Sequence, residues 1–367
     1  MVDKKVCIIG LGLIGGSLAR ALREKLGIND IIALNRTESS YIKAVEDGTI
    51  RAGFTEINDE VLSSDIIFIC TPVKRTTEFI ELLSGKVKPG CIITDVSSTK
   101  HEITDYVNNM SNPPVFIGGH PMAGSEKTGY NESYAHLFEN AFYILTPSKT
   151  SDDESIELLR KMAEGVGAIP VVLDAGEHDY LTAGISHVPH VIASAIVNLV
   201  RISDTPDGKM HKLSSGGFKD ITRIASSSPE VWESIITSNG HSIKRLLERF
   251  SKLIEEFSEK IDSCDKKWIY DFFESAKTYR NTFSSGKKSL ISPSYEIEVD
   301  VADTPGVIGK IATLLGEHMI NIKNINVSNS REYENGCLRI TLADQEGMNN
   351  SHNLLSEAGF KVNFSIN

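Results

Sequence analysis

The sequence predicts three domains of different fold class: an α/β domain, an all-α domain and a small α+β domain. Three observations predict this order. Short apolar segments alternate with helical segments over residues 1–172, apolar residues then recur every three or four positions over 173–285, and segments of alternating polarity follow over 294–367. The chain has 367 residues, enough for two or three domains. We therefore expect the domain boundaries to follow those three ranges.

Charge and composition exclude several classes of protein. The net charge of −11 has the wrong sign for a dedicated nucleic-acid binder. The five cysteines show no CxxC spacing and are expected to be reduced and mostly buried. The N-terminus enters an apolar segment without a signal-peptide pattern, and the longest apolar helix, residues 188–200, is shorter than the roughly 20 residues of a bilayer span. We expect a cytoplasmic protein whose partner is a small molecule, not nucleic acid or a membrane.

The first apolar segment, residues 6–9, leads directly into a glycine-rich loop and then into a helical segment. In the GxGxxG pattern the first glycine permits a tight turn, the second lets the backbone approach a pyrophosphate, and the third lets helix and strand pack closely. This context predicts a Rossmann-like, dinucleotide-binding domain; the alternative is a purely structural glycine turn. The expected cofactor-binding residues of the loop are Gly10, Leu11, Gly12, Leu13, Ile14 and Gly15.

Six further strands alternate with helices in this domain and predict a parallel, doubly wound sheet. The pattern S-x-x-E at Ser151–Glu154 predicts a capping box at the start of the helix that precedes the last strand. The expected strands are residues 31–34, 65–70, 91–95, 115–117, 141–145 and 170–173.

The end of the second strand bears on the choice of cofactor. Twenty residues past Gly15, where NAD-preferring sites usually carry Asp or Glu, the sequence has Asn35-Arg36-Thr37. A neutral Asn35 does not repel a 2′-phosphate, and the planar guanidinium of Arg36 can pair with one, which favours NADP over NAD. The alternative is that Arg36 is a solvated charge that stacks on the adenine. Thr71 and Pro72 complete the expected cofactor site.

The middle domain is predicted to be helical throughout. One long helix carries an apolar stripe that belongs to a core or a subunit interface, and a helical domain of this size after a dinucleotide domain suggests a homodimer by analogy. Ser228 is expected to cap a further helix that has Pro229 at its first position. The stripe consists of Ile243, Leu246, Leu247, Phe250, Leu253, Ile254, Phe257 and Ile261.

Polar residues stand out in this helical background. His178, His187 and His190 lie within thirteen residues, and three explanations stay open: a metal site, capping or core histidines, and a pocket for an anion. Spacing typical of zinc sites is absent, so we expect no metal. Arg223 lies beside apolar residues, where an unpaired charge is costly, so it is expected to meet an anion or to form a salt bridge to Asp220 or another carboxylate.

Five segments together resemble one known family. "GLGLIGGS", "DVSSTK", "GGHPMAGSEKTG", "EHDYLTAGISHVPH" and "GGFKDITRIASSSPEVW" occur in the order and spacing of the prephenate dehydrogenases, which include arogenate dehydrogenases. The resemblance covers about residues 1–285. The motif residues of the family fall on Ser98, His120, His178, His190, Arg223 and Trp232.

The resemblance implies oxidative decarboxylation of prephenate to 4-hydroxyphenylpyruvate, a step of tyrosine biosynthesis. His120 would accept the proton of the ring hydroxyl, and Ser98 would orient His120 or the substrate, unless Ser98 only caps the next helix. Arg223 would bind a substrate carboxylate. The expected remainder of the pocket is His178, His190, Trp232 and Glu126, the last holding its own loop or a water on the substrate side.

Two positions depart from the usual pattern of the family, and other substrates and functions stay open. Lys219 stands where the family often has Arg, and Asn35-Arg36 puts NAD, the commoner cofactor of the family, in doubt. Arogenate is the closest alternative substrate; a β-hydroxyacid dehydrogenase and a catalytically idle amino-acid sensor are more distant. Gly118 and Gly119, before His120, are expected to leave room for the nicotinamide or the substrate.

The C-terminal segment alternates polar and apolar residues from Tyr295, and "DTPGVIGKIATLLGEHMINIKNI" follows. The βαββαβ order resembles an ACT domain, a module that often binds amino acids. The resemblance implies feedback inhibition by tyrosine; the alternative is a structural or dimerising domain. The expected effector-binding residues are Asp303, Pro305, Gly306, Asn321 and Ile322.

Overall fold

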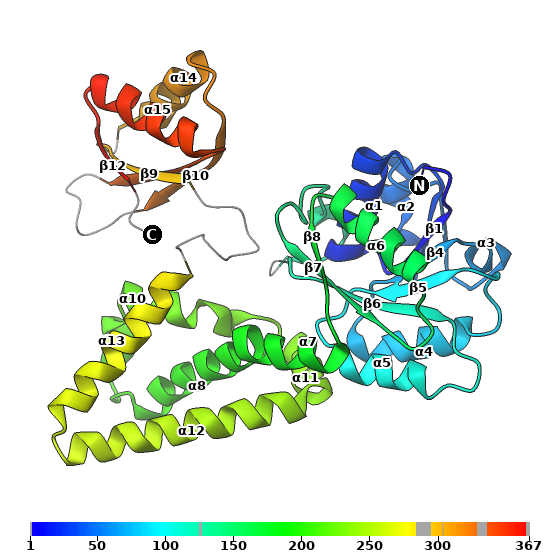
Figure 1. Ribbon diagram of the computed structural model, residues 1–367, viewed down its shortest axis with the longest axis horizontal. Helices are drawn as coiled ribbons and strands as arrows, with labels where there is room; N and C mark the ends of the chain where they lie inside the picture. Colours follow the sequence, from blue (N-terminus) through cyan, green and yellow to red (C-terminus); the bar gives the residue numbers. More distant parts are fainter. Residues whose placement is uncertain (1, 125–126, 284–294, 303, 329–335, 365–367) are drawn as a thin grey trace. The chain divides into compact units, whose positions relative to one another are not determined.

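The computed structural model describes residues 2–124, 127–283, 295–302, 304–328 and 336–364. The chain divides into two compact units, Met1–Ile254 and Glu255–Asn367. The first unit contains the sheet domain and most of the helical domain, and the second contains the small C-terminal domain (Figure 1). The three expected domain boundaries stay a prediction.

An eight-stranded sheet in the order β3-β2-β1-β4-β5-β6-β7-β8 forms the N-terminal domain. The prediction of a parallel sheet is confirmed for every pair except β6 and β7, which are antiparallel. The described residues between these two strands contain no α-helix, and the chain returns in the opposite direction. The strands are β1 (Val6–Ile9), β2 (Ile31–Leu34), β3 (Ala52–Phe54), β4 (Ile66–Ile69), β5 (Ile92–Asp95), β6 (Val115–Pro121), β7 (Phe142–Pro147) and β8 (Ile169–Val172).

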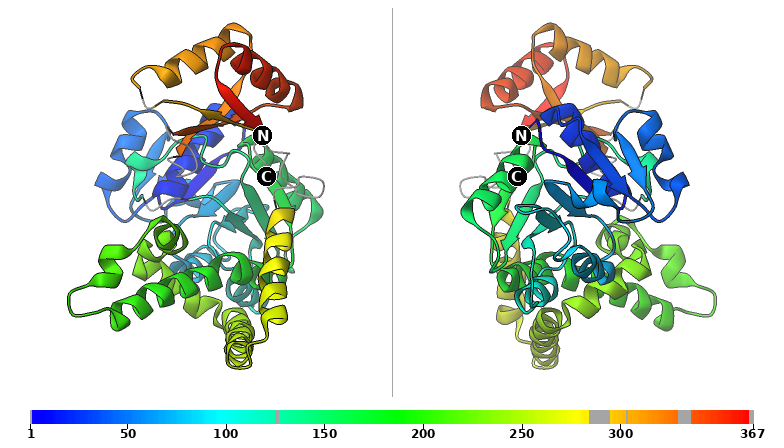
Figure 2. Two further views of the ribbon diagram at one scale, coloured as in Figure 1. Left: turned by 90° about the vertical axis from the view of Figure 1, so that its left-hand side faces the viewer. Right: turned by 90° about the vertical axis from the view of Figure 1, so that its right-hand side faces the viewer.

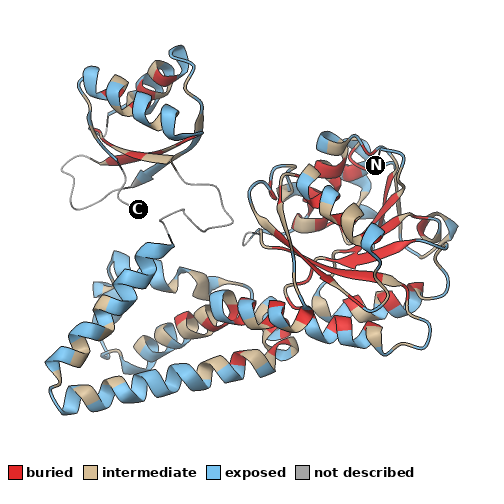
Figure 3. Cartoon of the chain, in the orientation of Figure 1, coloured by how far each residue is buried: buried red, intermediate tan, exposed pale blue. Residues whose placement is uncertain are grey.

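Helices cover both faces of this sheet (Figures 1 and 2). Alternate side chains of β1 pack on opposite faces of the sheet: Val6 and Ile8 belong to one apolar cluster, and Cys7 and Ile9 to the other. The strands are therefore buried on both faces and read as continuous apolar runs (Figure 3). The helices are α1 (Leu13–Leu26), η1 (Glu38–Ser40), α2 (Ile42–Glu46), α3 (Asp59–Leu62), α4 (Val73–Leu83), α5 (His101–Asn108), η2 (Tyr130–Glu132) and α6 (Asp153–Gly165).

Two details of this domain differ from expectation. Strand β3 was not predicted, because its three residues, Ala52–Phe54, form an edge strand without a β-branched residue. The capping residue of α6 is Asp152, whose carboxylate accepts a hydrogen bond of 2.7 Å from Ser155 N–H. Ser151 instead donates its hydroxyl to Phe116 C=O, at 2.7 Å, so the predicted capping box is wrong by one residue.

The helical domain begins with one continuous helix. A π-helical turn, η3 (Ala183–His187), joins α7 (Ala175–Thr182) to α8 (Val188–Ser203). Because the turn does not interrupt it, the combined helix runs for 29 residues and contains an 18-residue stretch with mean hydropathy 1.4, so by length and composition alone it could cross a membrane. The expectation that the apolar helix is too short for a span is therefore wrong. Its buried His178, Asp179 and His187 form hydrogen bonds to other elements.

The remaining helices confirm one expected cap and one expected stripe. Ser228 caps α11, its hydroxyl accepting from Val231 N–H at 3.4 Å. The stripe lies on a single helix, α12; its Ile243 is buried, while Leu253 and Ile254 are exposed. These elements are α9 (Lys209–Leu213), α10 (Gly216–Thr222), η4 (Arg223–Ser226), α11 (Pro229–Ser238), α12 (Gly240–Asp262) and α13 (Lys266–Thr282).

The C-terminal domain has the expected βαββαβ order. Its antiparallel sheet runs β10-β11-β9-β12, and the apolar face of this sheet packs on the two helices. Pro305 and Gly306 form the turn before α14, with φ of +91° at Gly306, while Asn321 and Ile322 lie at the start of β10. Asp303 lies outside the described residues. The elements are β9 (Tyr295–Asp300), α14 (Val307–Glu317), β10 (Ile322–Ser328), β11 (Cys337–Leu342), α15 (Gln345–Glu357) and β12 (Lys361–Phe364).

Two glycines of β6 are required by the protein's own packing. A Cβ at Gly118 would collide with the hydroxyl of Thr146 and with the side chain of Lys100. A Cβ at Gly119 would lie 2.5 Å from the carbonyl oxygen of Asp95. The expectation that these glycines leave room for a ligand is therefore wrong, because neighbouring protein atoms already fill that space.

Gly119→Ala should lower the free energy of unfolding by about 1–3 kcal/mol, because the added methyl group overpacks the junction of β5 and β6. Urea denaturation measures this change. Gly217→Ala is the matched control: it lies in α10, and a methyl group added there would meet no atom within 4 Å, so the stability should stay the same or rise by about 0.5–1 kcal/mol. Equal stabilities of the two variants would contradict the packing argument.

Candidate active site

A pocket with a volume of about 540 Å³ opens where several strands of the large sheet end. Parallel strands of a doubly wound sheet place ligands at this edge. Five side chains expected from the sequence meet here, although they come from separate elements: Ser98 after β5, His120 at the end of β6, His190 on α8, Arg223 on η4 and Trp232 on α11.

His120 has one ring nitrogen committed to the protein. Its Nδ1 lies 2.8 Å from Nε2 of His178, so Nε2 of His120 is the nitrogen left for a ligand in the pocket. Burial lowers the pKa of His120 well below its usual value, and His178, Lys100 and His187 lower it further. The imidazole is therefore neutral at pH 7, the state that a proton acceptor requires.

His178 does not line the pocket, contrary to expectation, because its side chain is fully buried behind His120. Its Nδ1 lies 2.8 Å from the carboxylate of Asp179. The same carboxylate accepts hydrogen bonds from the backbone N–H groups of Lys100, at 2.7 Å, and His101, at 2.9 Å. Asp179 thus links the helical domain to the start of α5.

A buried ion pair lies beneath the strand that carries His120. The ammonium of Lys100 contacts the carboxylate of Asp95, and both side chains are fully buried. Asp95 also accepts from Gly119 N–H and Ser97 N–H, each at 3.0 Å. The sequence analysis missed this pair, although the lysine of "DVSSTK" follows a buried strand and could have been suspected of needing a partner.

The far side of the pocket is aromatic and cationic. Trp232 stacks on His190 with ring centroids 3.9 Å apart, and His190 Nδ1 lies 2.7 Å from Ser186 C=O. Arg223 is exposed and lines the pocket. Among the described residues it forms no ion pair, so the alternative of a salt bridge to Asp220 is wrong. A guanidinium in this position is available to an anionic ligand.

Ser98 lines the pocket without a hydrogen bond to His120. His120 Nδ1 is already paired with His178, and the part of the chain that the structure describes offers no partner to the Ser98 hydroxyl. The alternative role as a helix cap is wrong, because α5 begins at His101 and Lys100 occupies the capping position. The Ser98 hydroxyl therefore faces the space that a ligand would occupy.

The glycine loop has the features of a phosphate cradle. Gly10 adopts φ of +99°, a Cβ at Gly12 would meet no atom within 4 Å, and α1 begins without a side-chain cap or an acidic residue in its first turn. Free helix N–H groups of this kind bind phosphate. The hydroxyl of Thr71 is buried without a partner in the described ranges. These residues fit a dinucleotide.

Asn35 contributes differently from its expected role beside the ribose. Its Oδ1 accepts from Leu11 N–H at 3.0 Å and its amide donates to Ser40 C=O at 3.3 Å, so it braces the glycine loop. Arg36 and Thr37 are exposed next to it. The Thr37 hydroxyl lies 3.2 Å from those of Ser39 and Ser40, which gives a cluster of hydroxyls beside Arg36.

Two further expectations concern Glu126 and a metal ion. Glu126 lies outside the described residues. In the ranges that the structure describes, no three His, Cys, Asp or Glu side chains come together to hold a metal ion.

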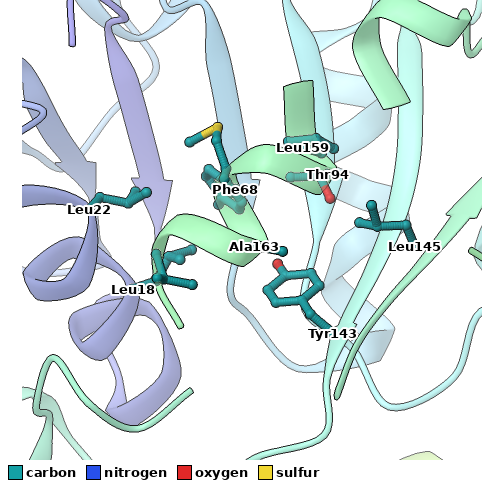
Figure 4. Close-up of a pocket in the computed structure, with 10 residues that line it drawn as sticks. Leu18, Leu22, Phe68, Thr94, Tyr143, Leu145, Leu159 and Ala163 are labelled. Atoms are coloured by element: carbon teal, nitrogen blue, oxygen red, sulfur yellow. The ribbon is translucent and has the colours of Figure 1, made fainter. Parts of the chain in front are cut away.

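A separate cavity in the core is a packing feature. It lies between the sheet and helices α1 and α6, its volume of about 10 Å³ has room for at most one water molecule, and none of its lining residues lines the pocket of His120 (Figure 4). Figure 4 shows the hydroxyl of Tyr143 directed into it among Leu18, Phe68 and Leu159. Its lining is almost wholly hydrocarbon, so it does not resemble a site for a charged substrate.

Three parts of the chain match domains described for one family. Residues 18–172 match the prephenate dehydrogenase nucleotide-binding domain, 174–276 the prephenate dehydrogenase dimerization domain, and 295–348 the ACT domain. A prephenate dehydrogenase of Bacillus subtilis is 36% identical over 346 residues, which cover 93% of this chain and 92% of that protein.

The chain belongs to the prephenate dehydrogenase family.

Solved structures agree with this family. The prephenate dehydrogenase of Aquifex aeolicus, in complex with hydroxyphenyl propionate and NAD+, is 32% identical with a TM-score of 0.72, covering 77% of this chain and 99% of that chain. The arogenate dehydrogenase of Synechocystis is 29% identical with a TM-score of 0.69, covering 76% and 99%. This prephenate dehydrogenase family member is therefore an oxidoreductase with a nucleotide-binding domain for NAD or NADP and a C-terminal ACT domain.

Proposed function

We propose that this enzyme converts prephenate to 4-hydroxyphenylpyruvate in tyrosine biosynthesis, with His120 as the base. The observation that carries this proposal is His120 itself: a neutral imidazole whose Nδ1 is held by His178 and whose Nε2 is left for the pocket. Ser98 and Arg223 line the same pocket, and the relatives named as prephenate dehydrogenases support the choice of substrate.

The proposed reaction removes hydride from C4 of the substrate ring and carbon dioxide from C1. Nε2 of His120 accepts the proton of the C4 hydroxyl while the C4–H bond breaks, and the nicotinamide, when bound, accepts the hydride. The electron pair of the broken C1–carboxylate bond enters the ring and completes the aromatic system. The phenolate oxygen then takes its proton back from His120, so no net proton is released.

The other pocket residues bind and orient the substrate in this proposal. Arg223 pairs with a substrate carboxylate through its planar guanidinium. Ser98 donates to or accepts from the C4 hydroxyl, and the stacked rings of His190 and Trp232 contact the side chain of the substrate. Arogenate, which has an amino group where prephenate has a keto oxygen, is the second candidate, supported by the similarity to the Synechocystis enzyme.

We further propose that NADP is preferred over NAD. Arg36 is exposed beside the hydroxyls of Thr37, Ser39 and Ser40, and no carboxylate stands at position 35 to repel a 2′-phosphate. Gly10 to Gly15 would hold the pyrophosphate, while Thr71 and Pro72 would lie along the cofactor.

The enzyme is also proposed to be a cytoplasmic homodimer. The match to a dimerization domain supports the dimer, as do exposed apolar side chains on the helical domain. On α8 these are Val197, Leu199 and Ile202, with 37%, 59% and 73% of their surface exposed.

His120→Asn should lower kcat by about 10²–10⁴-fold, because the amide cannot accept the hydroxyl proton. The affinity for the cofactor should not change. Formation of reduced nicotinamide with prephenate or arogenate, each tested with NAD and NADP, measures the rates. A near-normal kcat would remove His120 from the mechanism.

Arg223→Ala should instead raise KM for the substrate at least about tenfold, since a charged hydrogen bond contributes about 1.5–3 kcal/mol. Arg201→Ala, on α8 away from the pocket lining, is the control.

Arg36→Ala should raise KM for NADP by about 10–100-fold and leave KM for NAD nearly unchanged, because only NADP carries the phosphate that the guanidinium binds. Lys43→Ala removes another exposed cation on α2 and should affect neither cofactor. Equal or better use of NAD by the unaltered enzyme would refute the preference for NADP.

Tyrosine, the proposed effector of the ACT domain, should inhibit turnover and raise the thermal midpoint of the full-length enzyme. A ligand that binds only the folded protein stabilises it by about 2.7 kcal/mol at a hundred times its Kd. Phenylalanine is the control ligand. If tyrosine changes neither the rate nor the thermal midpoint, the ACT domain does not sense it.

A further inference from the structure

We propose that Asp179 is a positioning residue for the reaction, which acts through His178 to decide which ring nitrogen of His120 is left without a proton. The inference depends on the proposed role of His120 as base. It concerns a chain of three side chains, Asp179, His178 and His120, that leads from the buried interior to the pocket.

The geometry of this chain is continuous. The Asp179 carboxylate lies 2.8 Å from His178 Nδ1, and His178 Nε2 lies 2.8 Å from His120 Nδ1. His178 has no exposed surface and Asp179 is 2% exposed, so water does not compete for these contacts. Asn239 holds the segment in place by donating to Asp179 C=O at 2.7 Å.

The direction of the hydrogen bonds follows from the carboxylate. The carboxylate of Asp179 lies at the N-terminus of α5, where its two oxygens accept from the backbone N–H groups of Lys100 and His101. Because these oxygens act as acceptors, His178 donates to the carboxylate from Nδ1. With its proton on Nδ1, His178 accepts at Nε2, which requires a proton on Nδ1 of His120. Nε2 of His120 is left as a lone pair directed to the pocket.

The charged groups around the pair favour this neutral arrangement. The ammonium of Lys100, from the segment after β5, opposes a positive charge on His120, although Asp95 neutralises most of it. His187, on η3, also faces His120, and burial lowers the pKa of His187 to about 4, so it is neutral as well. Asp179 is the one acceptor in direct contact with the two-histidine chain among the described residues.

Asp179→Leu tests the inference in the full-length enzyme, because leucine has a similar volume and no acceptor. Without an acceptor at its Nδ1, His178 is free to carry its proton on Nε2 and donate it to His120 Nδ1, which moves the proton of His120 to its own Nε2, where it blocks the base. We expect kcat to fall by about 10²–10⁴-fold, with KM for substrate and cofactor within about twofold. Asp105→Leu, the same substitution at an exposed position of α5, should retain the normal kcat.

The tautomers themselves provide a readout that does not depend on activity. In protein labelled with ¹⁵N-histidine, NMR should show His120 and His178 protonated at Nδ1 in the unaltered enzyme and at Nε2 in Asp179→Leu. Unchanged tautomers, or a kcat within about twofold of normal, would overturn the inference. If the unaltered enzyme shows the expected tautomers but His120→Asn keeps its activity, the proposed role of His120 fails while the hydrogen-bond chain stands.

If Asp179→Leu does not fold, two substitutions of His178 of similar volume test the inference. His178→Gln keeps an amide oxygen near the place of Nε2 and can still accept from His120 Nδ1, whereas His178→Leu cannot. The inference requires that Gln retain at least about tenfold more kcat than Leu at a similar KM. Equal rates would show that His178 only fills space, and Asp179 would then have no route to His120.

Discussion

The active site depends on one buried carboxylate. Asp95, at the end of β5, accepts hydrogen bonds from the backbone of Ser97 and Gly119 and contacts the ammonium of Lys100. These contacts fix the two segments that carry Ser98 and His120 relative to each other. A charge without exposed surface is tolerated only when it is fully paired, and removal of one partner of such a pair typically costs about 3–5 kcal/mol. The pair therefore makes the geometry of the pocket difficult to distort.

A second carboxylate connects this arrangement to the helical domain. Asp179, on α7, accepts from the first backbone N–H groups of α5 and from His178. One side chain thus stabilises a helix terminus of the sheet domain and supports the imidazole behind His120. The pocket itself is lined by residues of both domains, and the contact between His120 and His178 belongs to the same interface.

The family's chemistry requires little covalent participation from the protein, because aromatisation drives the reaction. The structure accordingly provides a neutral imidazole, an exposed guanidinium and an aromatic wall, and these features lie in a pocket rather than in the apolar cavity of the core. In the proposed function, η4 and α11 recognise the substrate and the turn after β2 recognises the cofactor. Substitutions that alter one of these two specificities are therefore expected to leave the other unchanged.

The sequence by itself determined the βα alternation, the glycine loop, the long helix α12 and the βαββαβ domain, because each depends on local periodicity or turn chemistry. It also singled out His120, Ser98 and Arg223 through their motifs. Only the tertiary structure decided that β7 runs antiparallel to β6, that Gly118 and Gly119 accommodate protein atoms, and that His178 lies behind His120. These outcomes depend on contacts between residues far apart in the chain, such as Asp95 with Gly119 and Asp179 with Lys100. No local pattern encodes such pairings, because they form only when separate strands and helices pack together.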